Sequence, residues 1–284
     1  MKFNKFKEQK NKFKTKTEMK LIPSLLKKRK SPRVGLVLSG GAARGFAHVG
    51  VIKALKEHGI EPDVVSGVSA GAIAGALFCD GYTPEEMLKI IKDKSLFKYA
   101  SFTVPKNGLL SIQNMHKVLE ESLKANKFED LQIPFYCNAT NLNTGKAEYF
   151  NKGDLPIRII ASASIPVLFK PVILNNQTYV DGGVMDNFPV KPLEKQVDKI
   201  IGVHVNPTAE EKEIKGLVKI AERSFHLSVN RNIEEMIQSC DLFIQPEKVK
   251  KFGLMSVSEG RKIFEAGYEE AMKVLKKTNV NKYK

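Results

Sequence analysis

The chain has 284 residues, of which 42% are hydrophobic, so it is long enough and apolar enough to bury the core of one large α/β domain. Its three cysteines, Cys79, Cys137 and Cys240, are widely spaced, which argues against a disulfide framework or a cysteine zinc site and favours a reducing compartment. The formal net charge is +15, but residues 1–30 alone carry twelve Lys or Arg and two Glu. We therefore expect a basic, disordered extension over residues 1–32, followed by a single domain over residues 33–284 that is only mildly basic.

No segment has the pattern of a targeting or membrane-spanning sequence. The apolar residues of 1–30 are scattered among lysines, whereas a secretory signal needs an apolar core of about 7–15 residues. The longest apolar run, residues 68–79, is interrupted by Ser69, Gly71 and Gly75 and is too short to span a bilayer. These features predict a cytoplasmic protein, which could lie at the inner membrane surface if the basic extension binds lipid.

Strand, glycine-rich turn and helix follow one another twice near the start of the predicted domain. Residues 34–38 form a short apolar run that predicts a buried strand, and residues 46–58 have the apolar spacing of an amphipathic helix. Residues 63–65 predict a second strand, which leads into a turn at 67–71 and a helix of small apolar residues. This alternation is typical of a parallel sheet with covering helices.

The rest of the chain alternates between helices, strands and hairpins. Thr83 and Pro84 predict a helix start, because threonine caps helices and proline suits the first helical position. Two hairpins are expected, one around the turn residues 143–145 and one around 175–177. Further helices are expected at 111–124, 214–239 and 258–277, and further strands at 199–205 and 241–245.

The sequence Gly67-Val-Ser69-Ala-Gly71 matches the pattern GxSxG between a predicted strand and a predicted helix. A turn that reverses a strand into a helix is sharp, so the residues flanking the serine must be small. Ser69 would face the unpaired N–H groups at the start of the helix, whose partial positive charge suits an oxyanion. We interpret Ser69 as a catalytic nucleophile; the alternative is a tight turn with an idle serine.

A second glycine loop spans residues 39–45, with the sequence SGGAARG. Its glycines do not have the GxGxxG spacing of a dinucleotide site, and the GK[ST] of a phosphate-binding P-loop is absent. Backbone N–H groups without blocking side chains favour an oxyanion hole beside Ser69. Arg44 either braces this loop or contacts an acidic headgroup.

The third motif, Asp181-Gly182-Gly183, follows the second predicted hairpin and by itself is most simply an Asp-Gly turn. Four motifs together change that interpretation: GGxxRG at 40–45, GxSxG at 67–71, ASASIP at 161–166 and DGG at 181–183. In this order and with these separations they resemble the patatin-like phospholipase family, in particular its small bacterial members. The resemblance covers about residues 34–195 well and the remaining C-terminal part more loosely.

This resemblance implies a three-layer α/β/α fold with a mainly parallel central sheet, and a Ser-Asp dyad that hydrolyses acyl esters of lipids. Ser69 would be the nucleophile and Asp181 the base, and the backbone amides of Gly40, Gly41 and Ala42 would form the oxyanion hole. The motif residues expected to support these turns are Arg44, Gly45, Gly67, Gly71, Gly182 and Gly183. The glycine loop departs from the family pattern by opening with a serine, and the last motif is DGG where many members have DGA. No cofactor or metal is implied.

Two alternatives to this mechanism remain open. A Ser-His-Asp triad of the α/β-hydrolase type has its histidine last, which nominates His204 or His226. However, His204 falls within a predicted strand and His226 within a predicted helix, where packing explains both. The alternative from another class is a catalytically quiet protein that keeps the pocket to sense lipid.

The basic extension has three interpretations. Phenylalanines and leucines are interleaved with its lysines, a composition that suits docking on anionic lipid. A nucleic-acid-binding arm and a plain solubilising tail are the other two. We expect a lipid or another acyl ester as the substrate, and we do not expect nucleic acid as a partner. Contact with anionic membrane through residues 1–30 stays open beside the solubilising tail.

Overall fold

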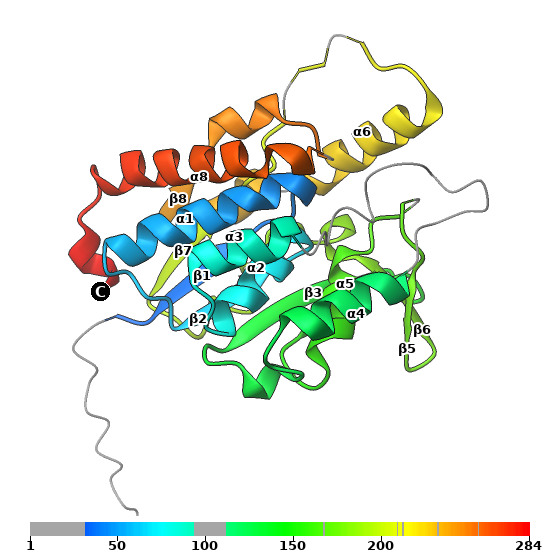
Figure 1. The fold of residues 1–284 in the computed structure, drawn as a ribbon, viewed down its shortest axis with the longest axis horizontal. Coiled ribbons are helices and arrows are strands. Elements are labelled where there is room, and N and C mark those ends of the chain that lie inside the picture. The colour runs from blue at the N-terminus through cyan, green and yellow to red at the C-terminus, as the bar shows by residue number, and fades with distance from the viewer. Residues whose placement is uncertain are drawn as a thin grey trace, which may run out of the picture. The chain divides into compact units, whose positions relative to one another are not determined.

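The apolar runs of the sequence form the centre of one mixed sheet in a computed structural model, which describes residues 32–93, 112–166, 168–208, 210–211, 213–231, 233–254 and 256–284. All but the last residue of the expected basic extension lie outside these described residues. The sheet has eight strands in the order β5-β6-β3-β2-β1-β7-β8, with β4 paired to β3 off this path (Figure 1). Its strands are β1 (Val34–Leu38), β2 (Val64–Gly67), β3 (Phe135–Asn141), β4 (Lys146–Phe150), β5 (Val172–Leu174), β6 (Gln177–Asp181), β7 (Lys199–Val203) and β8 (Leu242–Ile244).

The five strands β3, β2, β1, β7 and β8 are parallel, and β4, β5 and β6 add antiparallel pairs at the β3 side. The helices that flank the sheet are α1 (Phe46–Glu57), α2 (Ala70–Cys79), α3 (Pro84–Asp93), α4 (Ile112–Ser122), α5 (Leu155–Ala163), α6 (Leu217–Val229), α7 (Ile233–Ile237) and α8 (Gly260–Leu275). The expected class, a mainly parallel sheet flanked by helices, is confirmed.

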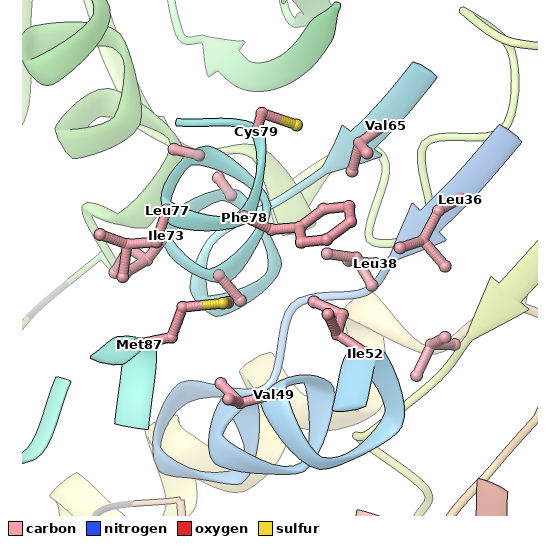
Figure 2. Close-up of a cluster of buried hydrophobic side chains, with 14 of the residues drawn as sticks. Leu36, Leu38, Val49, Ile52, Val65, Ile73, Leu77, Phe78, Cys79 and Met87 are labelled. Carbon is pink, nitrogen blue, oxygen red and sulfur yellow. The ribbon is translucent and has the colours of Figure 1, made fainter. Parts of the chain in front are cut away.

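The two faces of the sheet bury two separate clusters, because successive side chains of a strand point to opposite faces. Leu36 and Leu38 of β1 belong to the larger cluster, which also contains side chains of α1, α2 and α3 (Figure 2). Helices α1 and α8 pack side by side over this face (Figure 1). Val37 points the other way into a smaller cluster with Phe188 and Leu193, against which α7 packs through Ile233. One covering layer is therefore thick and helical, and the other is thin and built largely from the irregular segment 188–197.

Local signals explain most element boundaries. Thr83 caps α3 as expected: its Oγ1 accepts from the Glu86 N–H at 3.3 Å, and the Glu86 carboxylate accepts from the Thr83 N–H at 2.8 Å. Both expected hairpins are present, as β3–β4 and β5–β6. The β5–β6 turn places Asn175 and Asn176 at φ 49° and 61°, the left-handed region that asparagine tolerates better than most residues.

The expected single helix over 214–239 is wrong, because the structure has two helices there, α6 and α7. Gly216, at φ 85°, delays the start of α6 to Leu217. At the other end, the Asn230 side chain donates to the Asn206 carbonyl at 2.8 Å and to Thr208 Oγ1 at 3.2 Å. An asparagine that bonds to a distant backbone carbonyl holds the chain in a local turn and ends the helix.

The position of the candidate site follows from how β3 is paired. Strand β4 pairs with residues 137–141 along one edge of β3, so β2 and β6 must both use the opposite edge. There β2 pairs with residues 135–137, and β6, running in the opposite direction, pairs with residues 139–141. The ends of β2 and β6 therefore face each other along this edge, and Ser69, just after β2, meets Asp181, the last residue of β6.

Residues 31–284 form one compact unit. Within the part of this unit that the structure describes, none of the helices combines the length and the apolar character that crossing a bilayer demands.

Candidate active site

The turn between β2 and α2 holds Ser69 in a backbone conformation that side chains rarely adopt, with φ 53° and ψ −120°. The backbone around this turn leaves no room for a side chain at Gly67 or Gly71, the two glycines that flank Ser69. A Cβ atom at Gly71 would collide with the carbonyl oxygen of Leu38, and one at Gly67 would collide with the carbonyl oxygen of Gly71. The small flanking residues that the GxSxG pattern requires are therefore explained by a close contact within this turn, at Gly67, and by a close contact with the end of β1, at Gly71.

Ser69 and Asp181 are in direct contact. The Ser69 hydroxyl donates to Asp181 Oδ2 at 2.6 Å, and the other carboxylate oxygen accepts from the Gly183 N–H at 2.8 Å. Both residues are buried, with exposed fractions of 5% for Ser69 and 1% for Asp181. Strand β3 holds the backbone at this position, because Thr140 Oγ1 donates to the Asp181 carbonyl at 2.9 Å and the Asn138 amide donates to the Gly182 carbonyl at 3.2 Å.

Burial raises the pKa of Asp181 to about 7, against the hydrogen bonds from Ser69 and Gly183, which lower it. A carboxylate with a pKa near neutrality is a stronger base than an ordinary aspartate, yet it is still substantially ionised at neutral pH. The pair thus has both features needed to activate a hydroxyl: a short hydrogen bond and a base whose pKa lies near the working pH.

The glycine loop runs beside Ser69, since a Cβ atom on Gly40 would lie 3.4 Å from the Cβ of Ser69. Its three expected oxyanion donors are not equivalent. The Gly40 N–H donates to the Asn187 carbonyl at 3.3 Å, so this amide is already engaged within the protein. For the N–H groups of Gly41 and Ala42, no hydrogen-bond partner is found among the described residues.

Arg44 is buried and braces the glycine loop. Its Nε donates to the Phe252 carbonyl at 2.9 Å, and its Nη1 donates to Asn206 Oδ1 at 3.2 Å and to the Pro207 carbonyl at 3.3 Å. Of the two roles left open by the sequence, the geometry favours support of the loop over contact with a headgroup. Gly45 brings this loop against the Ser69 turn, because a Cβ there would collide with the side chain of Ala70.

Two further side chains hold the start of the loop. Ser39 Oγ accepts from the Val205 N–H at 3.0 Å and donates to the Gly40 carbonyl at 3.0 Å. The buried His48 lies 2.8 Å from the Ser39 carbonyl through Nε2, and burial lowers the pKa of His48 to about 4. His48 is therefore neutral near pH 7, and its Nε2–H donates to Ser39. Ser39, which opens the loop, is thus part of the loop's support.

The two histidines nominated for a triad bond elsewhere. His204 follows β7, with Nδ1 at 2.8 Å from Gln245 Oε1 and Nε2 at 3.3 Å from Asn230 Oδ1. His226 Nε2 lies 3.4 Å from the Asn206 carbonyl, and burial lowers the pKa of His226 to about 4. Neither histidine hydrogen-bonds to Ser69 or Asp181, so the geometry gives no support to a triad.

Several residues of the site have no assigned role in the sequence interpretation. Asn187, four positions after the DGG motif, supplies the carbonyl that engages Gly40. Ser162 lies within the ASASIP motif, and its Oγ accepts from the Ser69 N–H at 2.9 Å. The ASASIP motif includes Ser162, but its contact with Ser69 arises only in the tertiary structure. No group of three His, Cys, Asp or Glu that could hold a metal is found within the described ranges.

Comparisons with known proteins identify the family of this chain. Residues 36–194 match the family model described as patatin-like phospholipase. The chain is 28% identical over 277 residues to lysophospholipase NTE1 of Mycosarcoma maydis, which covers 85% of this chain and 15% of that relative. It is 32% identical over 179 residues to an uncharacterized NTE family protein of Mycobacterium tuberculosis, which covers 62% of this chain and 50% of that relative. Among solved structures, VipD from Legionella pneumophila shares the fold, with a TM-score of 0.53 and 16% identity over 86% of this chain and 67% of that chain.

Proposed function

The chain belongs to the patatin-like phospholipase family, and from this premise we propose that it hydrolyses carboxylic esters of lipids, as a phospholipase A or lysophospholipase would. In this proposal Ser69 is the nucleophile and Asp181 is the base, with no histidine between them. The observation that carries the proposal is the 2.6 Å hydrogen bond from the Ser69 hydroxyl to the buried carboxylate of Asp181.

The proposed reaction has two halves. Asp181 accepts the hydroxyl proton as Ser69 Oγ attacks the acyl carbonyl, and the tetrahedral oxyanion accepts hydrogen bonds from the amides of Gly41 and Ala42. The alcohol leaves with the proton from Asp181, and the acyl group stays on Ser69. Asp181 then takes a proton from water, whose oxygen attacks the acyl carbonyl. Asp181 returns that proton to Ser69 Oγ as the bond to the acyl group breaks and the fatty acid is released.

Two observations support a lipid as the substrate. The chain resembles proteins named lysophospholipases, although it spans only 15% of the length of the Mycosarcoma maydis relative. In addition, the large apolar side chains that are exposed in the described part of the chain are Leu142, Ile173, Met185, Ile214, Ile220 and Leu227. They lie after the carboxyl ends of β3 and β7, on the β5–β6 hairpin, in the turn after Asp181, and on α6, which contacts that turn (Figure 1). Exposed apolar side chains on these segments suit a substrate with acyl chains.

The rival function is a catalytically quiet protein that binds lipid in the same pocket. Two features of the dyad favour catalysis over binding alone. The strained backbone of Ser69 has a cost in stability that binding does not require. A carboxylate buried beside a hydroxyl, with its pKa raised to about 7, is likewise unfavourable in a simple binding pocket.

The test is covalent labelling of the intact protein with a fluorophosphonate, together with hydrolysis of a soluble p-nitrophenyl ester. We expect the wild type to be labelled and active, Ser69→Ala to lose labelling, and both Ser69→Ala and Asp181→Ala to lose at least about 10³-fold in kcat while staying folded. Activity within tenfold of wild type in either variant contradicts the dyad. Parallel assays on phospholipids and lysophospholipids then identify the substrate class.

His204→Ala and His226→Ala serve as matched controls, because they probe the triad directly. If the dyad operates alone, both variants retain fluorophosphonate labelling. A folded His204→Ala or His226→Ala protein that is as inactive as Ser69→Ala would replace the dyad by a triad.

A further inference from the structure

The end of α5 contacts both members of the dyad. The Ser69 N–H donates to Ser162 Oγ at 2.9 Å, and the Asp181 N–H donates to the Ser164 carbonyl at 2.8 Å. Ser162 and Ser164 are fully buried and only two positions apart, whereas Ser69 and Asp181 are separated by 112 positions. A single short segment therefore binds the backbone of the nucleophile and the backbone of the base.

We propose that this segment sets the distance between Ser69 and Asp181, and that Ser162 is a positioning residue for the nucleophile. The inference rests on the proposed function and concerns how its two groups are held. Ser162 acts through the backbone of Ser69 and needs no contact with substrate. Its hydroxyl oxygen is the acceptor that the N–H of a strained residue requires in a buried site.

Helix α5 is itself firmly anchored, as such a role requires. Asp154 caps its start by accepting from the Ile157 N–H at 3.1 Å, and Ser164 Oγ donates to the Ile160 carbonyl at 2.7 Å at its end. Ile159 and Ile160 are fully buried in the larger core cluster. Both ends of the helix and its apolar face are thus fixed, so the two hydrogen bonds at its end place Ser69 and Asp181 relative to a common support.

Loss of the Ser162 acceptor should act mainly on geometry. Without it, the Ser69 N–H is left buried and unpaired, and the turn can relax from its strained conformation, which moves Oγ relative to Asp181. Displacements of about 1 Å can cost about 100-fold in rate. In the wild type, the hydrogen bond from the Ser69 hydroxyl lowers the pKa of Asp181. The same displacement weakens this bond, so the pKa of Asp181 should rise further.

Ser66 offers a matched control on the strand that leads into the same turn. It is as buried as Ser162, but its Oγ has no hydrogen-bond partner among the described residues. Ser66→Ala therefore removes a buried serine hydroxyl three residues before Ser69 without removing a hydrogen bond. A loss of activity in Ser162→Ala that Ser66→Ala does not share cannot come from the mere removal of a buried hydroxyl.

The experiment compares Ser162→Ala, Ser162→Cys, Ser162→Thr and Ser66→Ala in the full chain, with a soluble p-nitrophenyl ester. We expect Ser162→Ala to lose about 10- to 100-fold in kcat with KM within about twofold, and to shift the acid limb of its pH profile upward. Ser162→Thr keeps the acceptor oxygen and should retain more activity than Ser162→Cys, because a thiol sulfur is a weak acceptor. Ser66→Ala should match wild type.

The variants also separate failure of this inference from failure of the proposed function. Wild-type kcat and pH profile in folded Ser162→Ala, or in folded Ser162→Cys should the alanine variant not fold, would overturn the positioning role and leave the dyad intact. An order in which cysteine is as active as threonine or better would also overturn it, because packing alone then explains the site. Persistent labelling of Ser69→Ala, in contrast, would overturn the proposed function itself.

Discussion

The dyad and the glycine loop lie side by side, but the protein holds them in different ways. Ser69 and Asp181 are fixed by β3, β6 and α5, through short hydrogen bonds that all come from residues within the matched range 36–194. The glycine loop is held largely from elsewhere: Arg44 reaches the 206–207 and 252 segments, and the Ala43 N–H donates to the Leu254 carbonyl at 2.9 Å.

This difference separates two parts of the candidate catalytic machinery. The proposed proton-transfer pair, Ser69 and Asp181, is held by residues of the range 36–194, whereas the position of the proposed oxyanion donors depends on the C-terminal part of the chain. A substitution near residue 206 or 252 should therefore impair stabilisation of the oxyanion without altering the pKa of Asp181. Substitutions made separately in each part test whether the two parts respond independently.

The largest effect is expected for Asp181→Asn, which should lose at least about 10³-fold in kcat and yet gain stability at high pH. Because the pKa of Asp181 is raised to about 7 in the folded protein, the folded state binds the proton more tightly than the unfolded state. The protonation of Asp181 therefore contributes fully to the stability of the wild type below about pH 4, and this contribution is lost as the pH rises towards 7. Near pH 8 the variant should be more stable by as much as about 4 kcal/mol, and the difference should shrink near pH 4.

Urea denaturation of both proteins at the two pH values checks this expectation. Asp181→Ala is less suitable, because it also leaves a cavity. A stability difference that does not change with pH would show that the carboxylate is not destabilised by burial.

The next largest effect is expected on kcat/KM of the wild-type protein as the pH is lowered. Protonated Asp181 cannot accept the hydroxyl proton, so kcat/KM for a soluble ester should fall about tenfold for each pH unit below about 7. A pH–rate profile between about pH 5 and pH 8 measures it. A profile that stays flat down to about pH 5 would mean that Asp181 titrates as an ordinary aspartate.

Arg44→Ala probes the glycine loop. It removes three hydrogen bonds from a buried guanidinium, so we expect kcat to fall about 10-fold or more and the free energy of unfolding to fall by about 2–4 kcal/mol. The midpoint of the acid limb should stay where it is in wild type, because the surroundings of Asp181 are unchanged. Arg44→Lys keeps the charge but cannot reproduce the three contacts, so its kcat and its free energy of unfolding should lie between those of wild type and Arg44→Ala. A shifted midpoint in Arg44→Ala would show that the two regions are coupled.

The smallest effect on turnover is expected from removal of residues 1–30, which lie outside the described residues. Turnover of a soluble ester should stay unchanged. Each Lys or Arg near an anionic surface contributes about 1 kcal/mol to binding, so the truncated protein should bind anionic vesicles more weakly. Because charges are screened over about 8 Å at physiological salt, binding of the full chain should also weaken as salt rises. Co-sedimentation with vesicles at low and high salt checks this, and equal, salt-independent binding by both proteins would leave the segment without a docking role.

The features that the sequence predicts well are those set by local chemistry. The capping residues of α3, the two asparagine-containing hairpin turns and the sharp turn at Ser69 each depend on a few neighbouring residues. The break between α6 and α7 and the engagement of the Gly40 amide could not be predicted, because each depends on a partner far away in the chain: Asn206 for Asn230, and Asn187 for Gly40. For the same reason the sequence marked Ser162 by its motif but gave it no role.

The shared edge of β3 also bears on how the candidate site is assembled during folding. Since β2 and β6 occupy successive parts of that edge, the hydroxyl and the carboxylate meet only after β6 has paired with the end of β3. Contacts between residues 112 positions apart close a long loop and form later than local ones. Reactivity of Ser69 towards a fluorophosphonate during refolding should therefore lag behind the helical signal in circular dichroism, which makes the dyad a built-in reporter of the moment when this edge of the sheet is complete.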